Sequence, residues 1–97
     1  MKTTADVLSI LRDFKPIAKR EYGLTKLGIF GSVARGEQTE DSDVDICYEG
    51  KVPSLLTLDL IQSDLERRLG CRVDMVRIRK GMNAMLHHKI QKEGVYV

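Results

Sequence analysis

The sequence predicts an α/β fold, in which helices pack on a sheet of three or four short strands. Two observations lead to this prediction: apolar residues recur at helical spacing in some segments, and they alternate with polar residues in others. The two kinds of segment follow one another along the chain, which is typical of an α/β layer arrangement. With 97 residues and 42% hydrophobic content, the chain is expected to form one domain, residues 1–97, with a modest core.

The first half begins with a helix that Thr3 or Thr4 can cap. The apolar face of this helix consists of Val7, Leu8, Leu11 and Phe14. Pro16 is expected to interrupt the helix and to begin a second, short helical stretch over residues 16–22. Residues 24–30 then form a strand, and a polar connection with one helical turn near its start follows it.

The second half begins with a strand around residues 44–48, where apolar and polar side chains alternate. Pro53 and Ser54 open the next helix, and Gly70 is placed to end it. The apolar stripe of this helix consists of Leu55, Leu58, Ile61, Leu65 and Leu69. The remaining elements are a strand over residues 72–76, a helix from Asn83 to about Lys92, and a short terminal strand over residues 95–97.

The composition excludes several classes of protein. No apolar run approaches the roughly 20 residues that span a bilayer, and the N-terminus lacks the apolar core of a signal peptide. Cys47 and Cys71 are too few for a disulfide framework and lack the spacing of a metal site. We therefore expect a cytoplasmic protein with free thiols and no membrane contact.

The net charge of +2 conceals a segregation of charge along the chain. Residues 1–36 carry a net +4, residues 37–66 a net −8, and residues 67–97 a net +6. An acidic middle between basic ends suits a site where carboxylates hold a cation and nearby bases meet an anion. Solvated charges that are unevenly ordered along the chain would give the same arithmetic.

Asp43 and Asp45 stand two apart on an expected strand, so both side chains leave one face, roughly 6–7 Å apart. A hard divalent cation would relieve their repulsion, and Mg²⁺ binds one or two carboxylates together with water and phosphate oxygens. The acidic outer face of an edge strand would show the same pattern, so this pair alone does not establish a metal site.

Gly31 and Ser32 mark the change from a strand to a helical turn. Backbone N–H groups and the Ser32 hydroxyl can converge there on an anion, and glycine allows a phosphate to approach the backbone. Taken alone, this Gly-Ser pair is also compatible with an ordinary strand-to-helix turn. The combination with the acidic pair on the next strand is more specific: if the two strands are neighbours, a triphosphate and its cation would share one groove.

Asp74 lies between Val73 and Met75 on a further expected strand, pointing away from both. On a strand adjacent to Asp45, it could bind a second metal ion or accept the proton of an attacking hydroxyl. Many strands carry such an acid without a function, and the spacing leaves both interpretations open.

The segments GSVARG, SDVD and VDMV together resemble the nucleotidyltransferase superfamily that includes DNA polymerase beta. The length and the tail IQKEGVYV are similar to the minimal nucleotidyltransferase (MNT) domains of prokaryotes, and this resemblance covers nearly the whole chain. It implies a small mixed β-sheet flanked by helices. It also implies transfer of a nucleoside monophosphate from a nucleoside triphosphate to an acceptor hydroxyl.

The resemblance assigns a role to each residue of these motifs. The residues that would bind the nucleotide are Gly31, Ser32, Arg35 and Gly36. The catalytic residues, which would also hold two Mg²⁺ ions, are Asp43, Asp45 and Asp74. Arg35 has an alternative, because it could instead pair with the acidic connection that follows it. Since all three carboxylates are present, we expect an active enzyme. Its residues do not say which nucleoside triphosphate it uses, and ATP is the substrate that the resemblance implies.

MNT proteins commonly act as antitoxins beside a HEPN-domain ribonuclease, so the resemblance implies transfer of AMP to a tyrosine of such a toxin. With no Trp and 5% aromatic residues, the chain has little with which to stack a base, so the acceptor specificity is expected to come from elsewhere. This agrees with the protein partner that the resemblance implies, and we do not expect a nucleic-acid partner. Two alternatives remain open: a non-catalytic module that masks a partner, and nucleotidyl transfer to an RNA end. The sequence also leaves open whether the domain forms a homo-oligomer.

Overall fold

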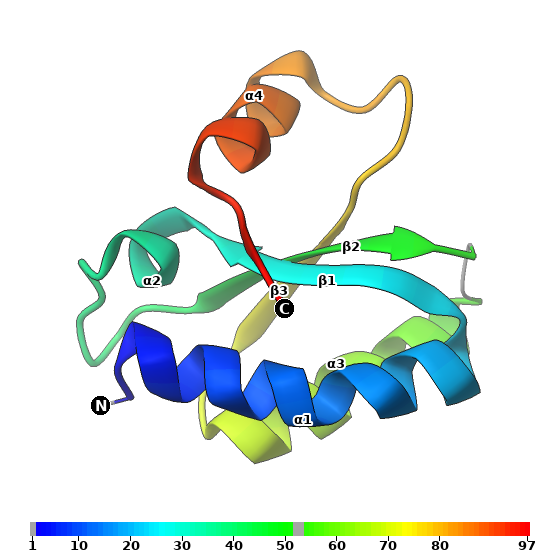
Figure 1. The fold of residues 1–97 in the computed structure, drawn as a ribbon, viewed down its shortest axis with the longest axis horizontal. Coiled ribbons are helices and arrows are strands. Elements are labelled where there is room, and N and C mark those ends of the chain that lie inside the picture. Colours follow the sequence, from blue (N-terminus) through cyan, green and yellow to red (C-terminus); the bar gives the residue numbers. More distant parts are fainter. Residues whose placement is uncertain (1, 52–53) are drawn as a thin grey trace.

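A computed structural model of the protein describes residues 2–51 and 54–97. The elements are α1 (Thr4–Tyr22), β1 (Leu24–Phe30), α2 (Gly31–Arg35), β2 (Val44–Gly50), α3 (Leu55–Leu69), β3 (Val73–Arg77), α4 (Ala84–Glu93) and β4 (Val95–Tyr96) (Figure 1). Apart from a break in the first helix, this is the order of elements that the sequence predicts.

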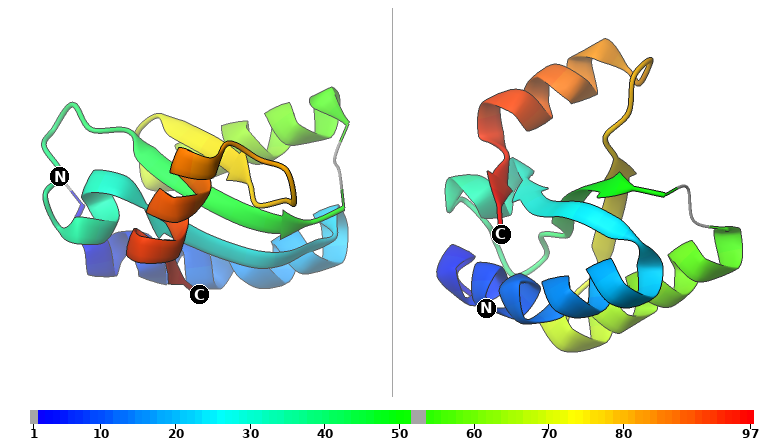
Figure 2. Two further views of the ribbon diagram at one scale, coloured as in Figure 1. Left: turned by 90° about the horizontal axis from the view of Figure 1, so that it is seen from above. Right: turned by 45° about the vertical axis from the view of Figure 1, so that its right-hand side comes forward.

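The four strands form one mixed sheet in the order β3-β2-β1-β4. β1 pairs antiparallel with both β2 and β4, whereas β2 and β3 are parallel and are joined through α3. α1 and α3 cover one face of this sheet, and α4 lies over the opposite face (Figures 1 and 2). The predicted small mixed sheet flanked by helices is therefore confirmed.

α1 begins as expected but does not break at Pro16. The Thr3 side chain accepts the N–H of Asp6, whose carboxylate accepts the N–H of Thr3, so the two residues form a capping box. The predicted interruption is wrong, because Pro16 lies on the exposed side of one continuous helix while Phe14 and Ala18 remain buried. Water can satisfy a carbonyl freed on the exposed side, and burial of the opposite face stabilises the helix on both sides of the proline.

α3 is capped by Ser54, whose hydroxyl accepts the N–H of Thr57. Most of its predicted apolar stripe is buried or packed against the core, but Leu55 is 87% exposed. The prediction for Leu55 is wrong because the fully buried part of α3 begins only at Ile61, so the first turn extends beyond the core. Pro53, the other residue expected to open this helix, lies outside the described residues.

The side chains of β2 alternate between two apolar clusters. One side of the strand enters the main core against α1 and α3, through Val44, Ile46 and Tyr48. On the other side, Cys47 belongs to a smaller cluster below α4 that also contains Phe30, Met82 and Ile90. Asp45 alternates with the core residues, so it leaves the sheet on the side that α4 covers. Within the described residues, no helix combines the length and apolar character that crossing a bilayer requires.

Candidate active site

Gly31 stands at the junction of β1 and α2 with a φ of +77°, a left-handed conformation that other residues rarely adopt. A methyl group on its Cα would overlap the carboxylate of Asp45 on β2. The glycine–serine turn and the acidic pair, predicted from separate segments, are therefore in direct contact. Only a residue without a side chain allows the backbone of the turn to lie so close to the acid.

The register of the sheet brings two of the predicted acids together. β2 and β3 run parallel, and Asp45 is the register partner of Asp74. The preceding partners, Val44 and Val73, are both buried in the main core, so the two aspartates leave the opposite face side by side. Asp43 lies two residues before Asp45, and its Oδ1 is 3.3 Å from Nε of Arg72.

The surroundings of Asp45 act on its carboxyl group in both directions. Its partial burial raises the pKa of the carboxyl group above the ordinary value of 3.8, and the negative charges of Asp74 and Asp43 raise it further. The positive charges of Lys89 and Arg35 act in the opposite direction. The charged form of Asp45 is thus disfavoured in the folded protein, and a cation bound beside it would relieve this cost.

The donor set fits Mg²⁺ as part of a coordination shell. Carboxylate oxygens are the ligands that this hard cation prefers, and it typically keeps several waters and substrate phosphate oxygens beside one or two carboxylates. In the part of the chain that the structure describes, no three Asp, Glu, His or Cys side chains are grouped so that they could hold a metal ion by themselves. The ion pair with Arg72 also engages Asp43. Of the three predicted acids, the structure therefore brings Asp45 and Asp74 together, and these two can offer carboxylate oxygens to a cation.

Arg35 and Gly36 already have partners within the protein. Nη1 of Arg35 donates hydrogen bonds to both carboxylate oxygens of Glu93, at 2.8 and 2.9 Å, and Nε donates to Glu37 at 3.0 Å. The hydrogen bond to Glu37 is the main cause that raises the pKa of the guanidinium. Gly36, with a φ of +72°, caps α2 by donating its N–H to two carbonyls of that helix. The pairing of Arg35 with the acidic connection, which the sequence left open, is therefore present.

Similarity to known protein families shows which family this chain belongs to. Residues 11–97 match the family model described as a nucleotidyltransferase domain. The chain belongs to this family. The predicted family and enzyme class are thereby confirmed, and the substrate of the enzyme is a nucleotide.

Individual nucleotidyltransferases are similar over most of the chain. The protein adenylyltransferase MntA of Thermococcus cleftensis is 38% identical over 98 residues, covering 100% of this chain and 98% of the relative. A solved structure described as a proposed minimal nucleotidyltransferase is 29% identical with a TM-score of 0.80, covering 97% of this chain and 95% of the other. A chain from the complex of a tri-AMPylated Shewanella oneidensis HEPN toxin with an MNT antitoxin shares the fold, with 20% identity, a TM-score of 0.61 and coverages of 96% and 66%.

Two residues of α4 that the sequence analysis did not single out lie beside this candidate site. Glu93 is the last residue of α4, and its Oε1 accepts the N–H of Gly31 at 3.2 Å. Lys89, one helical turn earlier, is close enough to lower the pKa of Asp45 through its charge. Their spacing of four residues places them on one side of the helix, but nothing in the sequence indicates that this side faces the aspartates.

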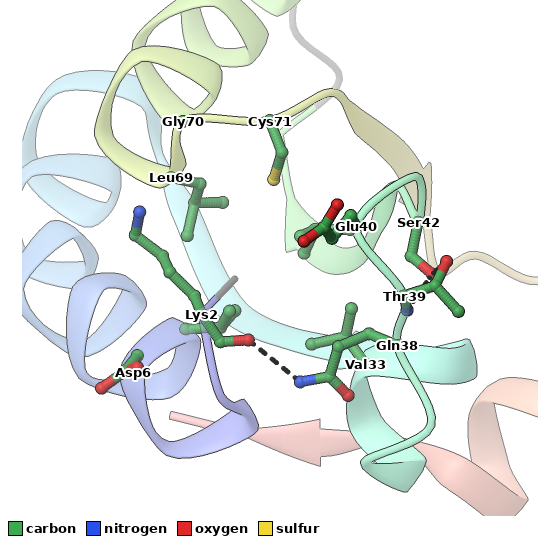
Figure 3. A pocket seen from close by; sticks show the side chains of 12 residues that line it. Lys2, Asp6, Val33, Gln38, Thr39, Glu40, Ser42, Leu69, Gly70 and Cys71 are labelled. Carbon is green, nitrogen blue, oxygen red and sulfur yellow. Dashed lines mark hydrogen bonds between the residues drawn. The ribbon is translucent and has the colours of Figure 1, made fainter.

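The structure also contains a cavity of about 400 Å³ at a different place (Figure 3). It lies between the start of α1, the end of α3 and the connection before β2, and its wall includes Lys2, Gln38 and Cys71. None of the seven predicted site residues lines it. Asp45 and Asp74, by contrast, leave the sheet on the side that α4 covers, and Gly31 lies against Asp45.

Proposed function

We propose that this protein, acting as one nucleotidyltransferase domain over residues 1–97, transfers AMP from ATP to a hydroxyl of a partner protein. The partner would be a HEPN-domain ribonuclease, and the modification of one of its tyrosines would silence it. The observation that carries this proposal is the pairing of Asp45 with Asp74 directly beside the turn at Gly31. The names of the relatives support it, since one is a protein adenylyltransferase and another is an MNT antitoxin bound to an AMPylated HEPN toxin.

Each residue of the site has a distinct task in this proposal. The backbone and hydroxyl of Ser32, together with the turn at Gly31, would hold the triphosphate of ATP. Asp43, Asp45 and Asp74 would hold Mg²⁺. When bound, Mg²⁺ supplies positive charge that neutralises the phosphates and lowers the pKa of the acceptor hydroxyl.

The transfer is a substitution at the α-phosphorus. The acceptor oxygen forms a bond to this phosphorus, the bond to the oxygen that bridges the α- and β-phosphates breaks, and pyrophosphate leaves with the electron pair. The proton of the acceptor hydroxyl passes to one of the aspartates and then to water. Asp74 suits this step because it is the exposed member of the pair, whereas Asp45 lies against Gly31.

A protein acceptor agrees with two features of this chain: it has little aromatic surface for binding a base, and one acid of the candidate site is exposed. The chain contains no Trp, and Asp74 is exposed on β3. A nucleic-acid acceptor would call for aromatic stacking surfaces beside the acids, which this composition does not favour. The choice of acceptor hydroxyl would therefore come from the shape of the docked partner.

Mass spectrometry tests the proposal directly. A HEPN-domain protein from the same organism is incubated with the purified protein, ATP and Mg²⁺, and it should gain the mass of adenylate on a tyrosine that peptide mapping identifies. Asp43→Asn and Asp45→Asn should abolish the gain, and Asp59→Asn, an exposed change of the same kind on α3, should preserve it.

Two outcomes would contradict this assignment. If the toxin is neutralised equally well by Asp43→Asn and Asp45→Asn, the protein acts by masking its partner. If labelled AMP enters an added RNA but not the toxin, the acceptor class is wrong.

A further inference from the structure

Glu93 joins the two ends of α2 to the end of α4. Its carboxylate accepts the N–H of Gly31, the first residue of α2, and both of its oxygens accept hydrogen bonds from Arg35, the last residue of α2. The side chain of Glu93 is 17% exposed, so water competes little for these contacts. One acidic side chain thus spans the whole length of the helix that carries the glycine–serine turn.

α2 depends on this contact because its own sequence does little to fix its start. The residue before it, Phe30, has no side-chain group that can accept a backbone N–H, and no side-chain cap is present. The helix has only five residues, too few to be stable without outside contacts. The Glu93 carboxylate supplies the missing acceptor at the first residue and an ionic partner at the last.

Glu93 is itself held firmly on both sides. Ile90, one turn earlier on α4, is 1% exposed and belongs to the smaller apolar cluster below α4. Directly after Glu93 and Gly94, β4 pairs with β1 at Gly28 and Ile29. A carboxylate fixed between a packed helix and a paired strand suits a permanent support better than a displaceable lid.

We propose that Glu93 is a positioning residue of the nucleotidyl-transfer site and that Arg35 is its counter-ion, with no role as a phosphate ligand. The inference rests on the proposed function and deepens it. Glu93 holds the Gly31 backbone against Asp45, and Arg35 neutralises the carboxylate so that it does not repel the triphosphate. Because the N–H of Gly31 already donates to Glu93, the part of this turn that would donate hydrogen bonds to the phosphates is Ser32, while Gly31 lets the backbone come close.

This assignment predicts a loss of nucleotide binding when Glu93 is changed. The affinity for the non-hydrolysable analogue of ATP, with Mg²⁺ present, should fall about tenfold in Glu93→Ala, as expected for loss of hydrogen bonds to a charged group. Glu93→Gln keeps oxygen and nitrogen at the same place and should lose less. Glu21→Gln, an exposed change at the far end of α1, is the matched control. Binding is measured by calorimetry well below the unfolding temperature of each variant.

A double-mutant cycle separates positioning from direct phosphate contact. If Arg35 acts only through Glu93, Arg35→Ala should weaken binding in the wild-type background but add almost nothing in Glu93→Ala. A further tenfold loss in the double variant would show that Arg35 binds phosphate and would overturn the assignment. Tighter binding by Glu93→Ala would also overturn it, because Glu93 would then be a competitor of the nucleotide.

The same measurements distinguish failure of this inference from failure of the proposed function. If the wild type binds the analogue but transfers no AMP to the toxin, the proposed acceptor is wrong and the role of Glu93 is still decided by affinity. If Glu93→Ala and Glu93→Gln bind like Glu21→Gln while only their unfolding temperatures fall, Glu93 is merely structural and the inference fails alone. If the wild type binds no nucleotide, both proposals are refuted.

Discussion

Replacing Asp45 by asparagine should stabilise the protein while it abolishes activity. Asp45 and Asp74 are register partners of like charge, and such pairs destabilise a sheet by amounts of up to about 1 kcal/mol. Burial and Asp43 add to the cost of the charge. In a domain of this size, about 1 kcal/mol corresponds to a rise of about 4–8 °C in unfolding temperature. AMP transfer should fall by more than about a hundredfold, since metal-held charge stabilisation is worth several kcal/mol.

The assay combines thermal unfolding followed by circular dichroism with incorporation of labelled AMP into the partner. Asp59→Asn, an exposed aspartate on α3, controls for loss of a charge away from the site. Addition of Mg²⁺ and the ATP analogue should stabilise the wild type more than Asp45→Asn, because a ligand that binds only the folded state raises its stability. An unfolding temperature of Asp45→Asn clearly below that of Asp59→Asn would refute the reasoning, since Asp45 would then be a structural hydrogen-bond acceptor.

Three further predictions test the contacts around the site. Gly31→Ala should lose more stability in urea unfolding than Gly81→Ala: both residues have positive φ (+77° and +85°), which costs roughly 1–3 kcal/mol for other residues, but only Gly31 would also collide with Asp45. Equal losses would argue against that contact. The stability advantage of Asp45→Asn over the wild type should shrink as the pH is lowered from about 7 to about 4. The charged Asp45 destabilises the folded wild type at pH values above its raised folded pKa, and this cost disappears as the pH falls toward 3.8, the pKa of the unfolded state. If the difference in stability between Asp45→Asn and the wild type does not change with pH, the raised pKa of Asp45 is contradicted. Iodoacetamide at about pH 8 should alkylate Cys71 well before Cys47, because burial raises the pKa of the Cys47 thiol to about 11 and Cys47 is 0% exposed. Equal rates, read by peptide mass, would mean that Cys47 is accessible.

Local signals in the sequence were enough to predict most of the fold. The cap at Thr3, the alternation along β2 and the glycine after α3 each depend on a few neighbouring residues, and the structure contains all three. The two errors arose where distant packing overrides local preference. Pro16 lies on the exposed side of a helix that the sheet stabilises, and Leu55 has the right spacing but lies beyond the core.

For the candidate site, too, the sequence indicated some features and could not resolve others. The types and spacing of Gly31, Ser32 and the aspartates indicated nucleotide chemistry, because few other patterns unite an anion-binding turn with paired acids. The role of Arg35 could not be resolved in this manner. Its choice between a phosphate and a carboxylate depends on Glu93, which lies 58 residues further along the chain.

The sequence by itself determined the order of helices and strands and the chemical kind of the site, because periodicity, caps and motifs are properties of short segments. Only the tertiary structure decided that Asp74 stands beside Asp45 and that α4 brings Glu93 to the glycine turn. Strand register and the direction of a helix face are set by the simultaneous packing of all elements, and no short segment carries that information.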